Sequence, residues 1–153
     1  MSQAANGVRE GGCRCGQVRF RLTGPDMLTM ACHCRGCQRM AAAPYALTMV
    51  VPAAGFELMA GEPVPGGLHG EVKHYHCPYC LSWVYTVPPA PTPMVNVRAT
   101  MLDEVSGSPP YMEMCTEEML PWAKTPAQHS FPGFPPDEAW GPMIAEYMQR
   151  GRG

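Results

Sequence analysis

Hydrophobic and polar residues alternate with a period of two over several short stretches of the chain. This period is typical of β-strands that bury one face. The stretches that we expect to form strands are residues 17–23, 28–31, 45–51, 56–59, 72–76, 83–87, 94–99 and 111–116. Turn residues at 24–26 and Gly/Pro-rich connections at 63–70 and 88–93 separate some of them. The pattern therefore predicts a mainly β protein.

A helical pattern occurs in two places. Residues 35–42 are expected to form one or two helical turns before Pro44. Near the C-terminus, apolar residues follow at helical spacing: Trp140, Met143, Ile144, Tyr147 and Met148. We expect Asp137 to cap this late helix and Pro142 to lie in its first turn, while residues 121–136 read as irregular.

The length of 153 residues suits a single domain with a hydrophobic core. With 18 prolines and 16 glycines, long helices are disfavoured and turns are favoured. We expect a disordered N-terminal tail at residues 1–8, one folded domain at 9–135, and a C-terminal helix and tail at 136–153.

The charge pattern argues against polyanionic partners. The formal net charge is −2, from 11 Lys and Arg against 13 Asp and Glu, so no basic footprint for nucleic acid is present. Lysine occurs only at positions 73 and 124, which also argues against binding to a membrane surface. No apolar run approaches the length of a membrane span, and residues 1–12 lack the apolar segment of a signal peptide. We therefore expect a cytoplasmic protein without nucleic-acid or membrane partners.

Seven of the eight cysteines lie in three short clusters. The clusters are Cys13 and Cys15, then Cys32, Cys34 and Cys37, and finally Cys77 and Cys80. Thiolates two or three positions apart suit a soft divalent cation such as zinc, and a reducing compartment favours metal binding over disulfides. The seven clustered cysteines divide into one group of four and one group of three. Four thiolates close a tetrahedral zinc site, whereas three leave one position open, as in reactive zinc sites.

The two cysteine pairs have the local chemistry of zinc knuckles. The first pair is followed by Gly16, and Cys77 and Cys80 enclose Pro78. Both features suit the tight backbone in which N–H groups point at the sulfurs. One metal joining the pairs would tie the first strands to the middle of the domain, although buried free thiols are the alternative. Residues 77–80 also match the redox motif of glutaredoxins, but a strand is expected to follow instead of a helix, so we interpret that match as coincidental.

The second cluster supplies three sulfurs. The fourth ligand of a metal bound there could be His33, water, a substrate or a distant residue, and the sequence does not decide among them. His33 lies between two cysteines, so its side chain is expected to point away from the metal. Cys115 lies in the expected strand at 111–116 without a partner cysteine, which favours a small core residue. If Cys115 were instead a ligand, the site would be a closed, structural one.

Three polar residues near the second cluster are candidate hydrogen-bond donors to negative charge that develops on a substrate bound there: His33, Arg35 and Arg39. Arg35 and Arg39 are four positions apart and would share one face of a short helix. The alternative for both arginines is a solvated surface charge, which is the commoner situation.

The order of the clusters resembles the glutathione-dependent formaldehyde-activating enzyme (GFA) family, which includes the centromere protein V-like domain. The motifs that carry the resemblance are Gly-Gly-Cys-x-Cys-Gly with its following strand (11–20), Cys-His-Cys-x-x-Cys (32–37) and Cys-x-x-Cys (77–80). The segments 56–63, 97–103 and 120–122 are also similar, so the resemblance covers roughly residues 9–135. One position departs from the family pattern: the usual glycine after the last structural cysteine is Leu81.

The resemblance implies a β-tent fold, in which antiparallel β-sheets lean together in a tent-like arrangement, with short helices and a C-terminal helix. It implies two zinc ions per chain. The implied ligands of the structural zinc are Cys13, Cys15, Cys77 and Cys80, and those of the second, catalytic zinc are Cys32, Cys34 and Cys37.

The implied reaction is the addition of glutathione to formaldehyde, which gives S-hydroxymethylglutathione and is classified in reverse as a carbon–sulfur lyase reaction. Zinc coordination deprotonates a thiol, and the thiolate can attack a carbonyl carbon. The expected partners are a small-molecule thiol and an aldehyde; their identity and the oligomeric state stay open. Two alternatives are a non-catalytic zinc module that binds a protein through the late helix, and a methionine sulfoxide reductase-like enzyme, whose nucleophile would have to be Cys115.

Overall fold

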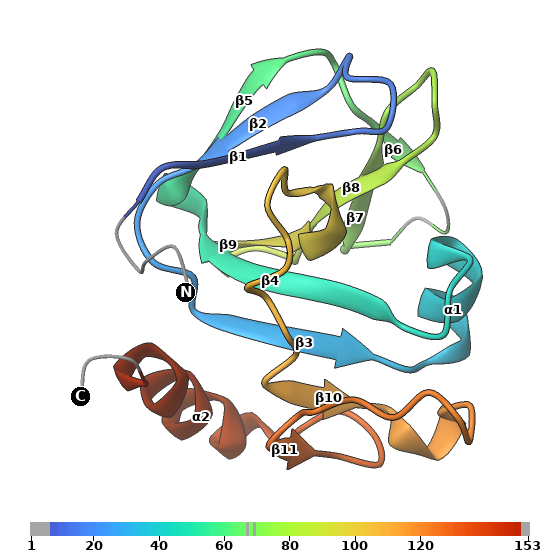
Figure 1. The fold of residues 1–153 in the computed structure, drawn as a ribbon, viewed down its shortest axis with the longest axis vertical. Helices are drawn as coiled ribbons and strands as arrows, with labels where there is room; N and C mark the ends of the chain where they lie inside the picture. Colours follow the sequence, from blue (N-terminus) through green and yellow to red (C-terminus); the bar gives the residue numbers. More distant parts are fainter. Residues whose placement is uncertain (1–6, 67, 69, 151–153) are drawn as a thin grey trace.

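The computed structural model describes residues 7–66, 68 and 70–150, and their architecture is mainly β (Figure 1). A three-stranded sheet has the order β1-β2-β5, and an eight-stranded sheet has the order β11-β10-β3-β4-β9-β8-β7-β6. Most of the expected N-terminal tail lies outside the described residues. The prediction of a mainly β fold with a short helix and a C-terminal helix is confirmed.

Eleven strands and two α-helices make up the described fold. The strands are β1 Arg9–Gly12, β2 Arg19–Leu22, β3 Leu28–Cys32, β4 Ala46–Pro52, β5 Phe56–Ala60, β6 Val64–Gly66, β7 Lys73–His76, β8 Trp83–Val87, β9 Met94–Arg98, β10 Met112–Met114 and β11 His129–Ser130. The helices are α1 Arg35–Ala41 and α2 Asp137–Gln149, with 3₁₀ turns at Ala53–Gly55, Ala99–Met101 and Thr116–Glu118. Within this part of the chain, neither α-helix is both long enough and apolar enough to cross a membrane.

The sheets are antiparallel, as expected, except at one edge of the large sheet, where two pairings are parallel. β10 pairs in parallel with β3 on one side and with β11 on the other. Parallel pairing needs a long crossover, and here the chain between β3 and β10 passes through both sheets. The consequence is that Met114 at the end of β10 pairs with Cys32 at the end of β3.

Three strands, β1, β6 and β11, lie in segments that the sequence pattern did not assign to strands. The two-residue strand β11 lies within the segment 121–136, which we expected to be irregular. β6 occupies part of the segment 63–70, which we expected to be a Gly/Pro loop, and it pairs with β7. β1 ends in two glycines, which are weak strand formers. Gly11 is nevertheless required there, because a Cβ would lie 2.3 Å from the carbonyl oxygen of Met101 and 2.6 Å from the ring of Phe20.

The C-terminal helix α2 is confirmed, but two details of its start are corrected. Asp137 is the first helical residue, and the preceding Pro136 holds the N-cap position without a capping side chain. Pro142 lies inside the helix rather than in its first turn; it has no N–H to donate to the carbonyl group four residues earlier. The apolar face is as expected: Met143 and Tyr147 are buried, and α2 packs on β3 at the lower edge of the view in Figure 1.

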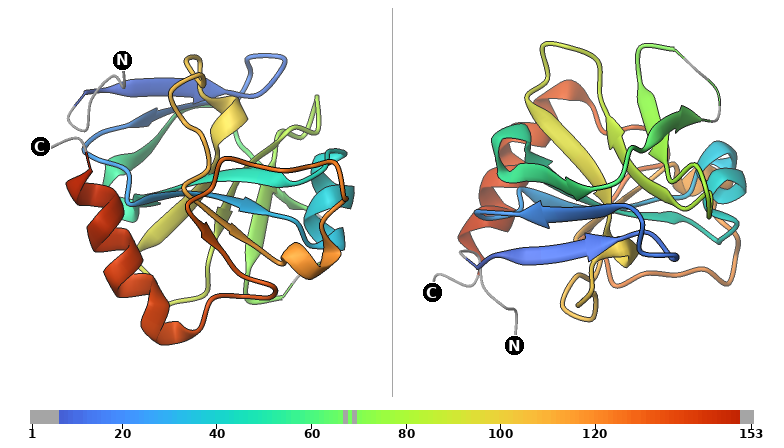
Figure 2. Two further views of the ribbon diagram at one scale, coloured as in Figure 1. Left: turned by 60° about the horizontal axis from the view of Figure 1, so that its bottom comes forward. Right: turned by 90° about the horizontal axis from the view of Figure 1, so that it is seen from above.

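Side chains on opposite faces of the eight-stranded sheet enter two hydrophobic cores. On β4, Met49 and Val51 join the core shared with the three-stranded sheet, whereas Val50 joins the core under α2. Figure 2 shows the three-stranded sheet and α2 covering different parts of the large sheet. Each core reaches one group of cysteines: Cys13 and Cys77 border the first core, and the second core includes Cys32, Cys115 and their neighbours.

Candidate metal centres

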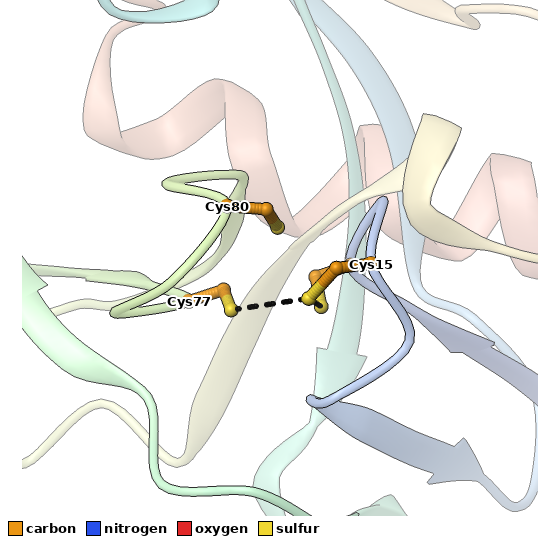
Figure 3. A group of neighbouring side chains, drawn as sticks. Cys15, Cys77 and Cys80 are labelled. Atoms are coloured by element: carbon orange, nitrogen blue, oxygen red, sulfur yellow. Dashed lines mark hydrogen bonds between the residues drawn. The ribbon is translucent and has the colours of Figure 1, made fainter.

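The loops between β1 and β2 and between β7 and β8 bring four cysteines together. The sulfurs of Cys13, Cys15, Cys77 and Cys80 all lie within 4.8 Å of one another. Figure 3 shows the side chains from the two loops converging, with Cys15 Sγ 3.8 Å from Cys77 Sγ. With zinc–sulfur bonds of about 2.3 Å, the sulfurs of a tetrahedral site are about 3.8 Å apart. The spacing of the four sulfurs therefore fits a zinc ion.

The backbone of these loops has the geometry of a knuckle. The N–H group of Val18 donates a hydrogen bond to Cys13 Sγ over 3.2 Å, and Gly16 has a φ of +84°. Leu81 also has a positive φ, of 61°, and its N–H group donates to the carbonyl oxygen of Cys77. The loop keeps the left-handed backbone that suits glycine, although this chain has a leucine there. Its side chain is 71% exposed, so the substitution causes strain in the backbone without a clash in the core.

The second group of cysteines is built from one strand-to-helix turn. Cys32 ends β3, Cys34 is the N-cap residue of α1, and Cys37 lies in the first turn of α1. Their three sulfurs lie within 4.8 Å of one another. The N–H group of Cys37 donates to Cys34 Sγ over 3.3 Å, so a cysteine sulfur caps the helix. The three predicted residues are therefore brought together as one candidate site.

The thiols of the second group strongly influence one another. A hydrogen bond from Cys37 is the main cause that lowers the pKa of Cys32 to about 6, and the same contact raises the pKa of Cys37. Three thiols this close cannot all become thiolates without a compensating positive charge. A divalent cation supplies that charge and deprotonates coordinating thiols. The donor set therefore fits zinc.

Cys115 lies next to the second group but is not one of its three mutually close thiols. The prediction that it lies within a strand is wrong: β10 ends at Met114, and Cys115 follows with a left-handed φ of 57°. Cys115 is buried in the core under α2. Burial, together with the charge of Cys32, raises the pKa of Cys115 to about 12. A buried thiol with this pKa is a poor nucleophile, which counts against a sulfoxide reductase-like activity.

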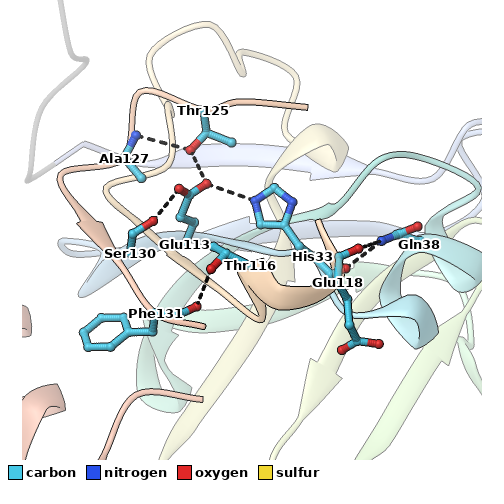
Figure 4. A network of polar contacts seen from close by, with 9 residues as sticks. All are labelled: His33, Gln38, Glu113, Thr116, Glu118, Thr125, Ala127, Ser130 and Phe131. Carbon is cyan, nitrogen blue, oxygen red and sulfur yellow. Dashed lines mark hydrogen bonds and ion pairs between the residues drawn. The ribbon is translucent and has the colours of Figure 1, made fainter. Parts of the chain in front are cut away.

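A buried polar network supports the turn that carries the three cysteines. The side chain of His33 is fully buried, and its Nε2 lies 2.9 Å from Oε2 of Glu113. Glu113 also accepts hydrogen bonds from Thr125 and Ser130 (Figure 4). The amide of Gln38 donates to the carbonyl oxygen of His33 over 2.7 Å. The prediction that the His33 side chain points away from the cysteines fits this arrangement, in which it connects β3 to β10.

Sequence reasoning missed Glu113 and a buried arginine. The candidate donors Arg35 and Arg39 are exposed, whereas Arg98 at the end of β9 is only 7% exposed. Burial lowers the pKa of Arg98 to about 10, against the opposing effect of the negative charges of Cys37 and Cys32. Arg98 therefore stays protonated at neutral pH. The available signal was a charged residue at the end of a strand that is mostly apolar.

The described chain is a mainly β protein that carries two cysteine groups, each with the geometry of a metal-ion site. The model of the glutathione-dependent formaldehyde-activating enzyme family matches residues 8–118, so the chain belongs to this family. A crystal structure of a Rhodobacter sphaeroides protein has a similar fold, with a TM-score of 0.52 and 18% sequence identity over 63% of this chain and 90% of that chain.

These comparisons confirm the resemblance and the fold class. The domain boundaries at 9–135 and 136–153 stay predictions, since the family match ends before α2.

Proposed function

We propose that this protein is a zinc-dependent enzyme of the carbon–sulfur lyase type, which adds a thiol such as glutathione to an aldehyde such as formaldehyde. The observation that carries the proposal is the group Cys32, Cys34 and Cys37, whose three sulfurs fit one metal ion and leave its fourth position for a substrate. Membership of the formaldehyde-activating family supports the same substrate pair.

In this proposal, the four-cysteine group holds a structural zinc and the three-cysteine group holds a catalytic one. When bound at the second site, zinc would stabilise the thiolate form of a thiol co-substrate. The chain itself supplies positive charge and rigidity around that site. Arg98 is the buried cation nearby, and the contact between His33 and Glu113 fixes the turn that carries the ligands.

The reaction balances without an oxidant or reductant. The thiol gives up its proton, its sulfur forms a bond to the carbonyl carbon, and the carbonyl oxygen gains a proton. The product is an S-hydroxymethyl thiol, and the reverse reaction breaks the same carbon–sulfur bond. We place this activity in a reducing compartment such as the cytoplasm, because the ligands have to be free thiols, as all eight cysteines are in the structure.

Metal content and catalysis can be measured on the same three proteins: wild type, Cys34→Ala and Cys115→Ala. We expect two zinc ions per chain in wild type and Cys115→Ala, and one in Cys34→Ala. Exchange NMR with ¹³C-formaldehyde and glutathione should show acceleration by wild type and Cys115→Ala, and only the spontaneous rate with Cys34→Ala. An undiminished rate with Cys34→Ala would overturn the proposal. Two zinc ions in wild type without any acceleration would favour the non-catalytic zinc module.

A further inference from the structure

The structure has a cavity of about 700 Å³. One wall is the end of α1 and the segment that follows it, and the opposite wall is the Cys77–Cys80 knuckle. Its walls combine apolar, aromatic and cationic side chains, among them Arg14, Met40, Tyr45, Leu81, Trp83 and Arg98. Arg14 and Leu81 are exposed, whereas Trp83 and Arg98 are buried. The cavity therefore leads from a solvent-accessible rim to a buried cation.

The cavity is a direct neighbour of the three-cysteine group. Met40 follows Cys37 by three positions on α1, so the two side chains lie on the same face of the helix, one turn apart. Ala46, another residue of the wall, pairs with Cys32 across strands β3 and β4. The cavity and the three-cysteine group thus share α1 and the start of β4, while Cys80 of the four-cysteine group lines the opposite wall.

Arg98 has hydrogen-bonding capacity that the described residues do not use. Its Nε is buried without a hydrogen-bond partner, and its Nη2 donates only a long bond, of 3.4 Å, to the carbonyl oxygen of Asn96. None of the carboxylates in the described part of the chain forms an ion pair with it. A guanidinium has five N–H donors, and leaving them unpaired in a buried place costs free energy. An acceptor from a ligand would remove this cost.

The guanidinium of Arg98 is also held in position. Its Cζ lies 4.0 Å from the centre of the Trp83 ring, which is a cation–π contact. Trp83 in turn donates a hydrogen bond from Nε1 to the hydroxyl of Thr86 over 3.0 Å, and this hydroxyl lies 2.9 Å from Nδ1 of His74. Contacts between β7 and β8 thus hold the Trp83 ring in place against Arg98. A guanidinium fixed in this way loses little entropy when it binds a ligand.

We propose that this cavity binds a carboxylate of the thiol co-substrate and that Arg98 is the residue that selects for it. This inference rests on the proposed function, since it assumes that the thiol binds at Cys32, Cys34 and Cys37. A guanidinium can form two parallel hydrogen bonds with a carboxylate, which gives both affinity and orientation. Arg14 at the rim is a second cation for a thiol that carries two carboxylates, as glutathione does. Arg98 therefore distinguishes a thiol that carries a carboxylate from a neutral thiol.

Two matched pairs of thiols test this specificity on the zinc-loaded protein. The first pair is 3-mercaptopropionate and its amide, and the second is glutathione and its glycine amide. Binding is measured by isothermal titration calorimetry with wild type, Arg98→Gln, Arg98→Lys and the control Arg21→Gln. Arg21 is a suitable control because it pairs with Glu10 in the three-stranded sheet and does not line the cavity.

We expect wild type and Arg21→Gln to bind the acid of at least one pair about tenfold or more tightly than the amide, the size typical of a charge-assisted hydrogen bond. Arg98→Gln should lose this preference, and Arg98→Lys should keep part of it. Equal affinities for acid and amide in both pairs with wild type would overturn the inference while leaving the proposed function intact. That result needs no variant, so it stands even if Arg98→Gln fails to fold. Absence of any thiol binding would instead overturn the proposed function, and this inference with it.

Discussion

Replacing Leu81 with glycine should stabilise the protein. Leu81 has a left-handed backbone with a φ of 61°, which costs a residue with a side chain roughly 1–2 kcal/mol and costs glycine almost nothing. Because Leu81 is 71% exposed, removing its side chain gives up little packing. Glycine also has more conformational freedom in the unfolded chain, which lowers the free energy of unfolding by roughly 0.5–1 kcal/mol. We therefore expect Leu81→Gly to raise the free energy of unfolding by about 0.5–1 kcal/mol.

Reversible urea unfolding of the zinc-loaded protein is the appropriate assay, at one fixed concentration of free zinc because bound metal contributes to stability. Leu81→Ala is the matched control, since alanine keeps the Cβ that makes this backbone unfavourable. We expect Leu81→Ala to stay within about 0.5 kcal/mol of wild type, as is usual for an exposed site. Zinc content should be equal in all three proteins.

The reasoning fails if Leu81→Gly is no more stable than Leu81→Ala. Such a result would mean that the knuckle does not need the left-handed conformation at position 81, or that the leucine side chain contributes packing that its exposure does not suggest. An increase in stability together with unchanged metal content would confirm that the usual family glycine serves the backbone rather than the metal.

Three further substitutions test the sites separately. Cys77→Ala should give unfolded or aggregated protein, because zinc supplies folding free energy on the order of 10 kcal/mol in small zinc domains; a soluble variant with a cooperative melt near the wild-type temperature would contradict the structural assignment. Cys115→Ala should cost roughly 1 kcal/mol or somewhat more in urea unfolding and keep two zinc ions per chain by elemental analysis, whereas loss of one ion would identify Cys115 as a ligand. Glu113→Gln should lower the free energy of unfolding by about 1–2 kcal/mol, since the charged acceptor for His33 is lost; the exposed control Glu117→Gln should change it by less than about 0.5 kcal/mol, and equal effects of the two variants would argue against the network.

The features that could be predicted from the sequence are those that short segments determine. Cys32, Cys34 and Cys37 lie within one strand-to-helix turn, so their spacing alone indicates that one ion can contact all three. Both ends of strand β8 are predicted correctly, because the knuckle precedes its apolar run and prolines follow it. The assembly of the two cysteine pairs into one group depended on the family resemblance, since nothing local links Cys13 to Cys77.

The features that could not be predicted depend on strand order and register. His33 and Glu113 are 80 positions apart and meet only because β10 lies parallel to β3. Arg98 lies near the cysteines because β9 pairs with β4, which pairs with β3. Alternation identifies which residues share a face of a strand, but it does not identify which strands are neighbours. For this reason the exposed Arg35 was a candidate donor, and the buried Arg98 was not.

The most direct test of the central claim is a titration of the cobalt-substituted protein with glutathione, followed by its visible absorption spectrum. The claim is that the group Cys32, Cys34 and Cys37 binds a metal whose fourth position accepts a thiolate. We predict a saturable change in the bands of one of the two cobalt ions, and no change in Cys34→Ala, which keeps only the four-cysteine group. A wild-type protein whose two cobalt ions both show four-sulfur spectra before glutathione is added, and do not respond to any thiol, would contradict the claim.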